Sequence, residues 1–150
     1  MLMTASDIET ADRLSRRRAR MFPALTVIFL AQQASYFSQP DTGMRAVDHV
    51  KIAAWLVLSI VLLLAVATGG FWLKPKAVRA LMDDEVTRAN RADAFRIAFL
   101  ATMAGAILLY FVNLFEPMSG RETIHLLTTI GIAVALIRFA MLERRAHKDG

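Results

Sequence analysis

Six polar residues near the ends of apolar segments carry side chains that could do chemistry. They are Gln32, Gln33, His49, Asn113, Glu122 and His125, which we call the outer polar cluster. Glu122 and His125 are three residues apart, so a helix places both on one face. Together with His49 they could coordinate a divalent cation, since imidazole and carboxylate groups are common ligands. The alternative is that these groups are hydrated or hydrogen-bonded between helices. We therefore predict no metal and no other cofactor, and keep an outer-face metal site as a hypothesis.

The sequence lacks the motifs of common catalytic sites. It contains no cysteine, which excludes disulfides, thiolate metal sites and cysteine nucleophiles. It has no glycine-rich phosphate loop, no HExxH and no GxSxG. No aspartate, glutamate or lysine lies deep within an apolar segment, whereas proton-coupled transporters usually need such a group near the bilayer midplane. We therefore predict no catalytic residue.

Four apolar segments must position these residues, and they indicate an integral membrane protein. The chain is 56% hydrophobic, and its mean hydropathy is +0.44. Residues 52–73 and 97–115 are uncharged runs of 22 and 19 residues, and about 20 helical residues span a hydrocarbon core of about 30 Å. Residues 123–142 form a third run, which includes Arg138, and residues 22–37 form a shorter run. We predict an all-α fold, a transmembrane four-helix bundle in a single membrane domain over residues 1–150.

The first apolar segment has a second interpretation. It follows five arginines in residues 13–20, so it could be the core of a cleaved signal peptide. No small-x-small cleavage site follows it, and we predict a retained helix. With four spans, fifteen of the 18 lysines and arginines lie on one side of the membrane, together with both termini. The positive-inside rule places that side in the cytoplasm. We expect a multi-pass protein of the bacterial inner membrane.

Residues 74–96 form a charged cytoplasmic loop between the second and third segments. Asp83 is a suitable N-cap, and no Gly or Pro occurs between residues 76 and 104, which predicts one helix over residues 84–115. Its first turns would project below the membrane as a solvated extension. They could also dock a protein partner or anionic lipid. The candidate docking residues here are Asp84, Glu85, Arg88, Asn90 and Arg91.

The pattern DDExxRxNRxxAFR in residues 83–96 resembles a stretch of small uncharacterised bacterial inner-membrane proteins that have four transmembrane helices. The resemblance implies a location and a helix count. It implies no activity.

Residues 1–21 form a basic N-terminal arm. Ser6 and Glu9 have the spacing of a capping box, which predicts a short helix lying along the cytoplasmic face. Arg16, Arg17 and Arg18 would then lie near lipid phosphates and complete the candidate docking surface. Arginines beside a membrane segment are a topology signal, so we expect no nucleic-acid partner.

We predict a non-enzymatic membrane protein that acts by association with a protein partner or anionic lipid, in an accessory, scaffold or regulatory role. Its partners would be membrane lipids and either a larger membrane protein or further copies of itself. One alternative is a small oligomeric transporter or channel, with Gln32, Gln33, Asn113 and His125 lining its outer vestibule. A second alternative is an outer-face metal-binding protein or membrane enzyme.

Overall fold

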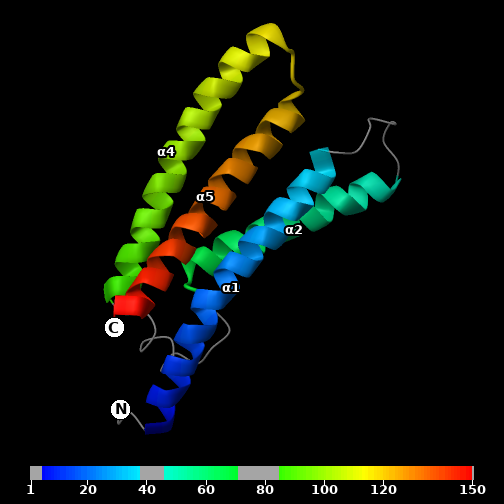
Figure 1. The fold of residues 1–150 in the computed structure, drawn as a ribbon. Coiled ribbons are helices and arrows are strands. Elements are labelled where there is room, and N and C mark those ends of the chain that lie inside the picture. The colour runs from blue at the N-terminus through cyan, green and yellow to red at the C-terminus, as the bar shows by residue number, and fades with distance from the viewer. Residues whose placement is uncertain (1–4, 38–45, 71–84, 150) are drawn as a thin grey trace.

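The computed structural model describes residues 5–37, 46–70 and 85–149, and within them the chain forms helices and no strand (Figure 1). The helices are α1 (Ala5–Phe37), α2 (Ala46–Ala67), α4 (Glu85–Phe115) and α5 (Gly120–Asp149). Successive helices run in opposite directions, so both ends of the chain lie at one end of the bundle (Figure 1). We call this the terminal end and the opposite one the far end. The predicted all-α class is confirmed.

Among the described residues, three helices are long and apolar enough to cross a membrane, and α1 is not one of them. The three candidate spans are His49–Ala67, Glu85–Phe115 and Gly120–Ala146. The chain therefore has the character of a membrane protein. The remaining predicted span, residues 22–37, forms the second half of α1, where Gln32 and Gln33 lower the hydropathy. A fourth crossing by α1 stays a prediction.

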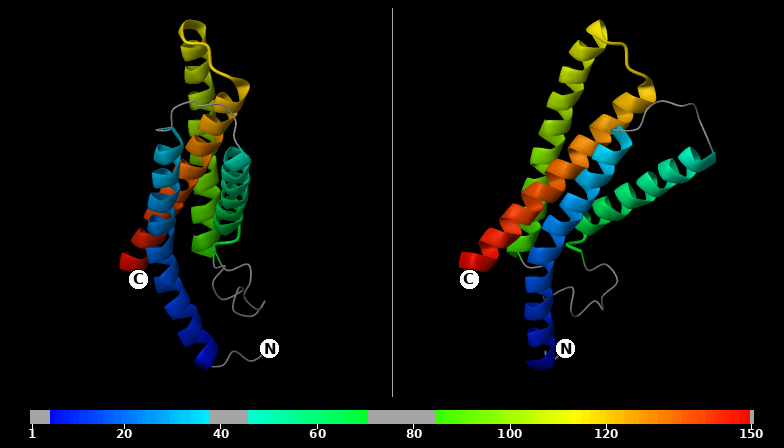
Figure 2. Two further views of the ribbon diagram at one scale, coloured as in Figure 1. Left: turned by 90° about the vertical axis from the view of Figure 1, so that its right-hand side faces the viewer. Right: turned by 45° about the vertical axis from the view of Figure 1, so that its right-hand side comes forward.

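The N-terminal arm is not a separate helix lying along a membrane face, as the sequence led us to expect. It is the first part of α1, which continues through Pro23. Proline removes a backbone donor inside a helix and commonly bends it. Here Thr26 Oγ1 donates to the carbonyl of Phe22 at 2.9 Å, which gives that carbonyl a partner beside the proline. Figure 2 shows that α1 curves and that its N-terminal part extends beyond the other helices.

The second predicted span, residues 52–73, was too long at its C-terminal end. α2 ends at Ala67, and Gly69 and Gly70 follow with φ angles of 68° and 86°. Glycine adopts this left-handed region without the steric cost that a Cβ imposes, so the glycine pair is a natural helix end. Pro75, Asp83 and Asp84, which we expected to shape the following loop, lie outside the described residues.

The third predicted helix agrees with the structure. We expected residues 84–115, and α4 covers Glu85–Phe115 without a break. α4 and α5 approach closely at two glycines. A Cβ added to Gly131 would lie 2.8 Å from Thr102 Oγ1, and one added to Gly105 would lie 2.9 Å from Ile130 Cδ1. Glycine at these positions therefore sets the spacing of the two helices.

α5 lies at the centre of the bundle and packs against α4, α1 and α2. Its buried side chains Leu136 and Phe139 join Phe22 and Phe29 of α1 in the core. The rings of Phe22 and Phe139 meet edge to face, with centroids 4.7 Å apart. α4 packs mainly on α5 and leaves large apolar side chains exposed, which suits contact with lipid. They include Phe99, Ile107, Leu108, Phe111 and Leu114.

Candidate functional site

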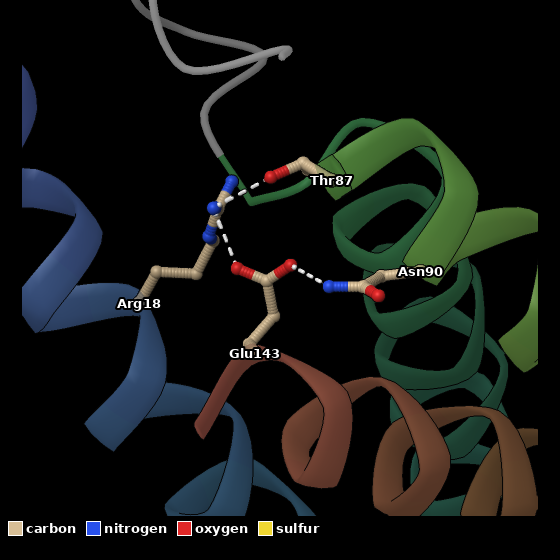
Figure 3. A network of polar contacts seen from close by, with 4 residues as sticks. All are labelled: Arg18, Thr87, Asn90 and Glu143. Atoms are coloured by element: carbon tan, nitrogen blue, oxygen red, sulfur yellow. Dashed lines mark hydrogen bonds and ion pairs between the residues drawn. The ribbon is translucent and has the colours of Figure 1, made fainter. Parts of the chain in front are cut away.

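Four polar side chains from three helices form a buried network at the terminal end of the bundle (Figure 3). We call Arg18, Thr87, Asn90 and Glu143 the terminal network. Arg18 Nη2 pairs with Glu143 Oε2 at 2.5 Å and donates to Thr87 Oγ1 at 2.9 Å. Asn90 Nδ2 donates to Glu143 Oε1 at 3.0 Å. Both carboxylate oxygens of Glu143 are thus engaged, one by α1 and one by α4.

The ion pair of the terminal network is almost fully buried. The side chains of Arg18 and Glu143 are only 6% and 5% exposed. A buried pair contributes when its charges are matched and hydrogen-bonded, and removal of one partner leaves an uncompensated charge. The C-terminal end of α2 joins the same region, because Arg91 Nη1 donates to the carbonyl of Ala67 at 2.8 Å. All four helices therefore meet at the terminal end.

The structure divides the predicted docking residues into internal and external groups. Arg18 is buried, Asn90 bonds to Glu143, and Arg91 bonds to α2, so these three act within the bundle. The side chains of Arg16, Arg17, Glu85 and Arg88 are exposed. Asp84 lies outside the described residues. The sequence alone did not distinguish the two groups. Which of several neighbouring arginines is buried depends on which face of the helix packs against the bundle, and the sequence does not show this.

The exposed arginines at the terminal end come from three helices, and we call them the arginine collar. Its members are Arg13, Arg16, Arg17 and Arg20 of α1, Arg88 of α4, and Arg144 and Arg145 of α5. Figure 1 places these parts of the three helices at the end that carries both chain termini. At the far end, the exposed basic residues in the described part of the chain are Lys51 and Arg121. The bundle is therefore strongly asymmetric in charge.

A second polar site lies at the far end, around His125. His125 Nε2 is 2.6 Å from Gln33 Oε1, and Thr129 Oγ1 donates to the same oxygen at 3.2 Å. The rings of Tyr36 and Trp55 stack on the imidazole, with centroids 4.1 Å and 4.3 Å away and interplanar angles of 11° and 21°. Two rings that close and that parallel do not fit on one face, so they enclose His125 from both sides. We call these five residues the distal cluster.

The structure brings Gln33 and His125 of the outer polar cluster into contact. Glu122 instead closes a capping box: its Oε2 accepts from Ser119 N at 2.8 Å, and Ser119 Oγ accepts from Glu122 N at 3.2 Å. Asn113 Oδ1 accepts from Met118 N at 2.6 Å in the turn before α5. These two side chains shape the α4–α5 connection.

The remaining members of the outer polar cluster are Gln32, which is half-buried, and His49, which is exposed. Among the residues that the structure describes, no three His, Cys, Asp or Glu side chains are grouped so that they could hold a metal ion. The hypothetical metal ligands His49, Glu122 and His125 are thus not assembled into such a group.

Two ion pairs between helices, Arg18–Glu143 and Asp93–Arg138, were not predicted from the sequence. Glu143 stands next to Arg144 and Arg145 and reads as part of a solvated tail. Arg138 carried a clearer signal, because an arginine within an apolar segment needs a partner. Its Nε donates to Asp93 Oδ2 at 2.7 Å, and the two side chains are 33% and 29% exposed.

No protein-family model matches the chain, and no curated protein or solved structure matches it significantly. The proposed resemblance to small bacterial inner-membrane proteins stays a prediction. Residue chemistry and geometry are therefore the basis for assigning a function.

Proposed function

We propose that this chain is a four-span protein of the bacterial inner membrane, with both termini in the cytoplasm, that acts by association rather than by catalysis. The observation that carries the proposal is the arginine collar. It gathers exposed positive charge at the terminal end, whereas the exposed lysines and arginines in the described part of the far end are Lys51 and Arg121. Basic residues concentrate on the cytoplasmic side of membrane proteins, which gives the orientation.

The collar suits an anionic lipid surface because of how it is distributed. Its exposed arginines come from three helices, α1, α4 and α5, whose segments lie at the terminal end. Positive charges that several helices contribute at one end suit a plane of lipid phosphates. Each arginine near such a surface contributes about 1 kcal/mol. The collar would hold the bundle at a defined depth and concentrate anionic lipid around it.

The N-terminal part of α1 provides the element for an accessory or scaffold role. It extends beyond the other helices (Figure 2). Its side chains Arg13, Arg16 and Arg17 are exposed. The buried pair of Arg18 and Glu143 fixes this arm to α5, so its direction is set by the bundle. A fixed arm presents its charges in one orientation to whatever lies at the membrane surface.

Native mass spectrometry of the protein released gently from its membrane tests the proposal. We expect bound phosphatidylglycerol or cardiolipin. The variant Arg16→Glu/Arg17→Glu/Arg88→Glu should lose most of it, by on the order of 100-fold in affinity if each arginine contributes about 1 kcal/mol. Arg121→Glu is the matched control, because it reverses an exposed arginine at the far end.

Equal lipid retention by the collar variant and the control would refute the proposal. Recovery of a larger protein whose binding is lost in the collar variant would replace lipid by a protein partner. A homo-oligomer that is indifferent to the collar would favour the transporter or channel.

A further inference from the structure

The distal cluster contains buried hydrogen-bond donors that its own contacts leave unused. Gln33 is 4% exposed, and its Nε2 has no hydrogen-bond partner among the described residues. The same holds for the buried indole Nε1 of Trp55. Ser59 is also 4% exposed, and its Oγ has no partner in the described part of the chain. Buried polar groups are nearly always paired, so three from one region need an explanation.

These donors belong to one place. The Nε2 of Gln33 is bonded to the same carbon as the Oε1 that contacts His125. The indole of Trp55 lies against that same imidazole. Ser59 is four residues after Trp55 on α2, so it lies one turn further along the same face. The donors therefore come from α1 and α2 where both helices meet α5.

The surroundings define what could accept these hydrogen bonds. Trp55, Ser59 and His125 lie within candidate membrane spans. The hydrocarbon core of a bilayer contains no water that could accept hydrogen bonds from their side chains. Gln33, Tyr36 and Trp55 contact His125, and Thr129 bonds to Gln33; none of these four side chains is charged at neutral pH. A ligand for this place must be uncharged, must dissolve in the membrane and must offer an acceptor oxygen.

We propose that the distal cluster binds the carbonyl oxygen of an uncharged lipophilic molecule, with Gln33 Nε2 and Trp55 Nε1 as donors and Ser59 as a third polar contact. Two sources of such an oxygen exist in membranes: the ring carbonyl of a quinone and the ester carbonyl of an acyl lipid. The aromatic rings around His125 hold that side chain still, so Gln33 presents its amide in a fixed orientation.

Fluorescence of Trp55 gives a direct test, because the chain has only two tryptophans. The full-length Trp72→Phe variant, purified in an alkyl maltoside that has no carbonyl group, reports on Trp55 alone. Decylubiquinone is the first probe, and it quenches indole on contact. Monoolein is the second probe, read as a shift of the Trp55 emission and as competition with quinone quenching. We expect saturable binding of at least one probe.

Neighbouring glutamines supply the matched comparison. Gln33→Leu in the Trp72→Phe background should weaken the apparent affinity at least tenfold. Gln32→Leu, at a half-buried position with no part in the cluster's contacts, should leave it unchanged. If Gln33→Leu unfolds the protein, the Ser59→Ala variant tests the site instead. The Ser59 hydroxyl makes no hydrogen bond within the described residues, so its removal should not disturb the fold. It should still weaken probe binding several-fold.

The two probes distinguish the two sources of the carbonyl oxygen. Saturation by decylubiquinone alone identifies a quinone, and saturation by monoolein identifies an ester carbonyl. Linear quenching with no saturation by either probe would overturn the proposal. Equal affinities of the Gln33→Leu and Gln32→Leu variants would also overturn it. If Gln33→Leu does not fold, equal affinities of Ser59→Ala and its Trp72→Phe parent would do the same.

Discussion

The terminal network and the distal cluster are two polar sites on the same seam of the bundle, and they are built in opposite ways. Both join α1 to α5, through Arg18 and Glu143 at one end and Gln33 and His125 at the other. His125 and Glu143 are 18 residues apart, which is five turns at 3.6 residues per turn and places them on one face of α5. Buried apolar side chains, including Phe22, Phe29 and Phe139, occupy the seam between them.

The difference lies in the charge of the groups that each site holds. In the terminal network, both oxygens of Glu143 are engaged by buried or half-buried partners. In the distal cluster the contacts are neutral and aromatic, and the donors of Gln33 and Trp55 remain unused within the described residues. A buried charge pair fixes two helices, whereas unused neutral donors leave room for a hydrogen bond to a third molecule. We therefore infer a positioning role for the terminal end and propose ligand recognition for the far end.

Glu143→Ala should have the largest effect on stability. It leaves the guanidinium of Arg18 buried without its carboxylate, which costs about 3–5 kcal/mol. SDS-induced unfolding followed by circular dichroism measures the loss. Glu9→Ala is the control, because Glu9 pairs with Arg13 only at an exposed site, where the side chains are 78% and 82% exposed. A loss as small as that of the control would show that the terminal network does not hold the helices.

His125→Ala should cost less, about 2–4 kcal/mol. The estimate combines two ring contacts worth about 0.5–1.5 kcal/mol each with one neutral hydrogen bond of about 1 kcal/mol. The same unfolding assay applies, with the exposed His49→Ala as the matched control. If His125→Ala proved more damaging than Glu143→Ala, the neutral site would be the stronger clamp, and the comparison between the two ends would be reversed.

Asn90→Ala should cost about 1–2 kcal/mol, because it removes one half-buried hydrogen bond to the carboxylate of Glu143 and leaves the ion pair in place. Asn90→Asp, which keeps the shape but sets a carboxylate against Glu143, should cost more. Chemical denaturation of both variants in one detergent measures the order. An Asn90→Asp variant as stable as the natural protein would mean that Asn90 contributes through its shape and not through its amide donor.

The double variant Arg18→Met/Glu143→Leu should have the smallest effect. Replacement of a whole buried ion pair by apolar side chains of similar size is often neutral or stabilising, since no charge is left alone. Its free energy of unfolding should lie within about 1 kcal/mol of the natural protein. A loss equal to the sum of the single substitutions would show that the two residues act separately and that their pairing is incidental.

The sequence predicted the helices well and the side-chain partners less well. Long apolar runs and the uninterrupted stretch before Phe115 were sufficient to predict α4 and α5. The glycine pair at residues 69–70 carried a stop signal that the apolar run around it obscured. Glu143 and Arg18 stand in charged segments, and only the rotation of α1 against α5 shows that they face inward.

For the distal cluster, the sequence identified two of the polar residues but not the side chains that surround them. Gln33 and His125 were both recognised as outer polar residues, because each lies toward the far end of its helix. The sequence did not show that Tyr36 and Trp55 enclose the imidazole, since that depends on how α1, α2 and α5 are rotated about their axes. It also placed Glu122 beside His125, although its carboxylate turns back to cap its own helix at Ser119.

Accessibility of single cysteines in intact cells tests the central claim, which is that the terminal end with its arginine collar faces the cytoplasm. The chain has no cysteine, so Arg145→Cys and Arg121→Cys each introduce one reactive thiol at an exposed position. A membrane-impermeant maleimide applied to spheroplasts should label Arg121→Cys at once and Arg145→Cys only after permeabilisation. Labelling of Arg145→Cys from outside, with Arg121→Cys protected, would contradict the account and place the collar on the outer face.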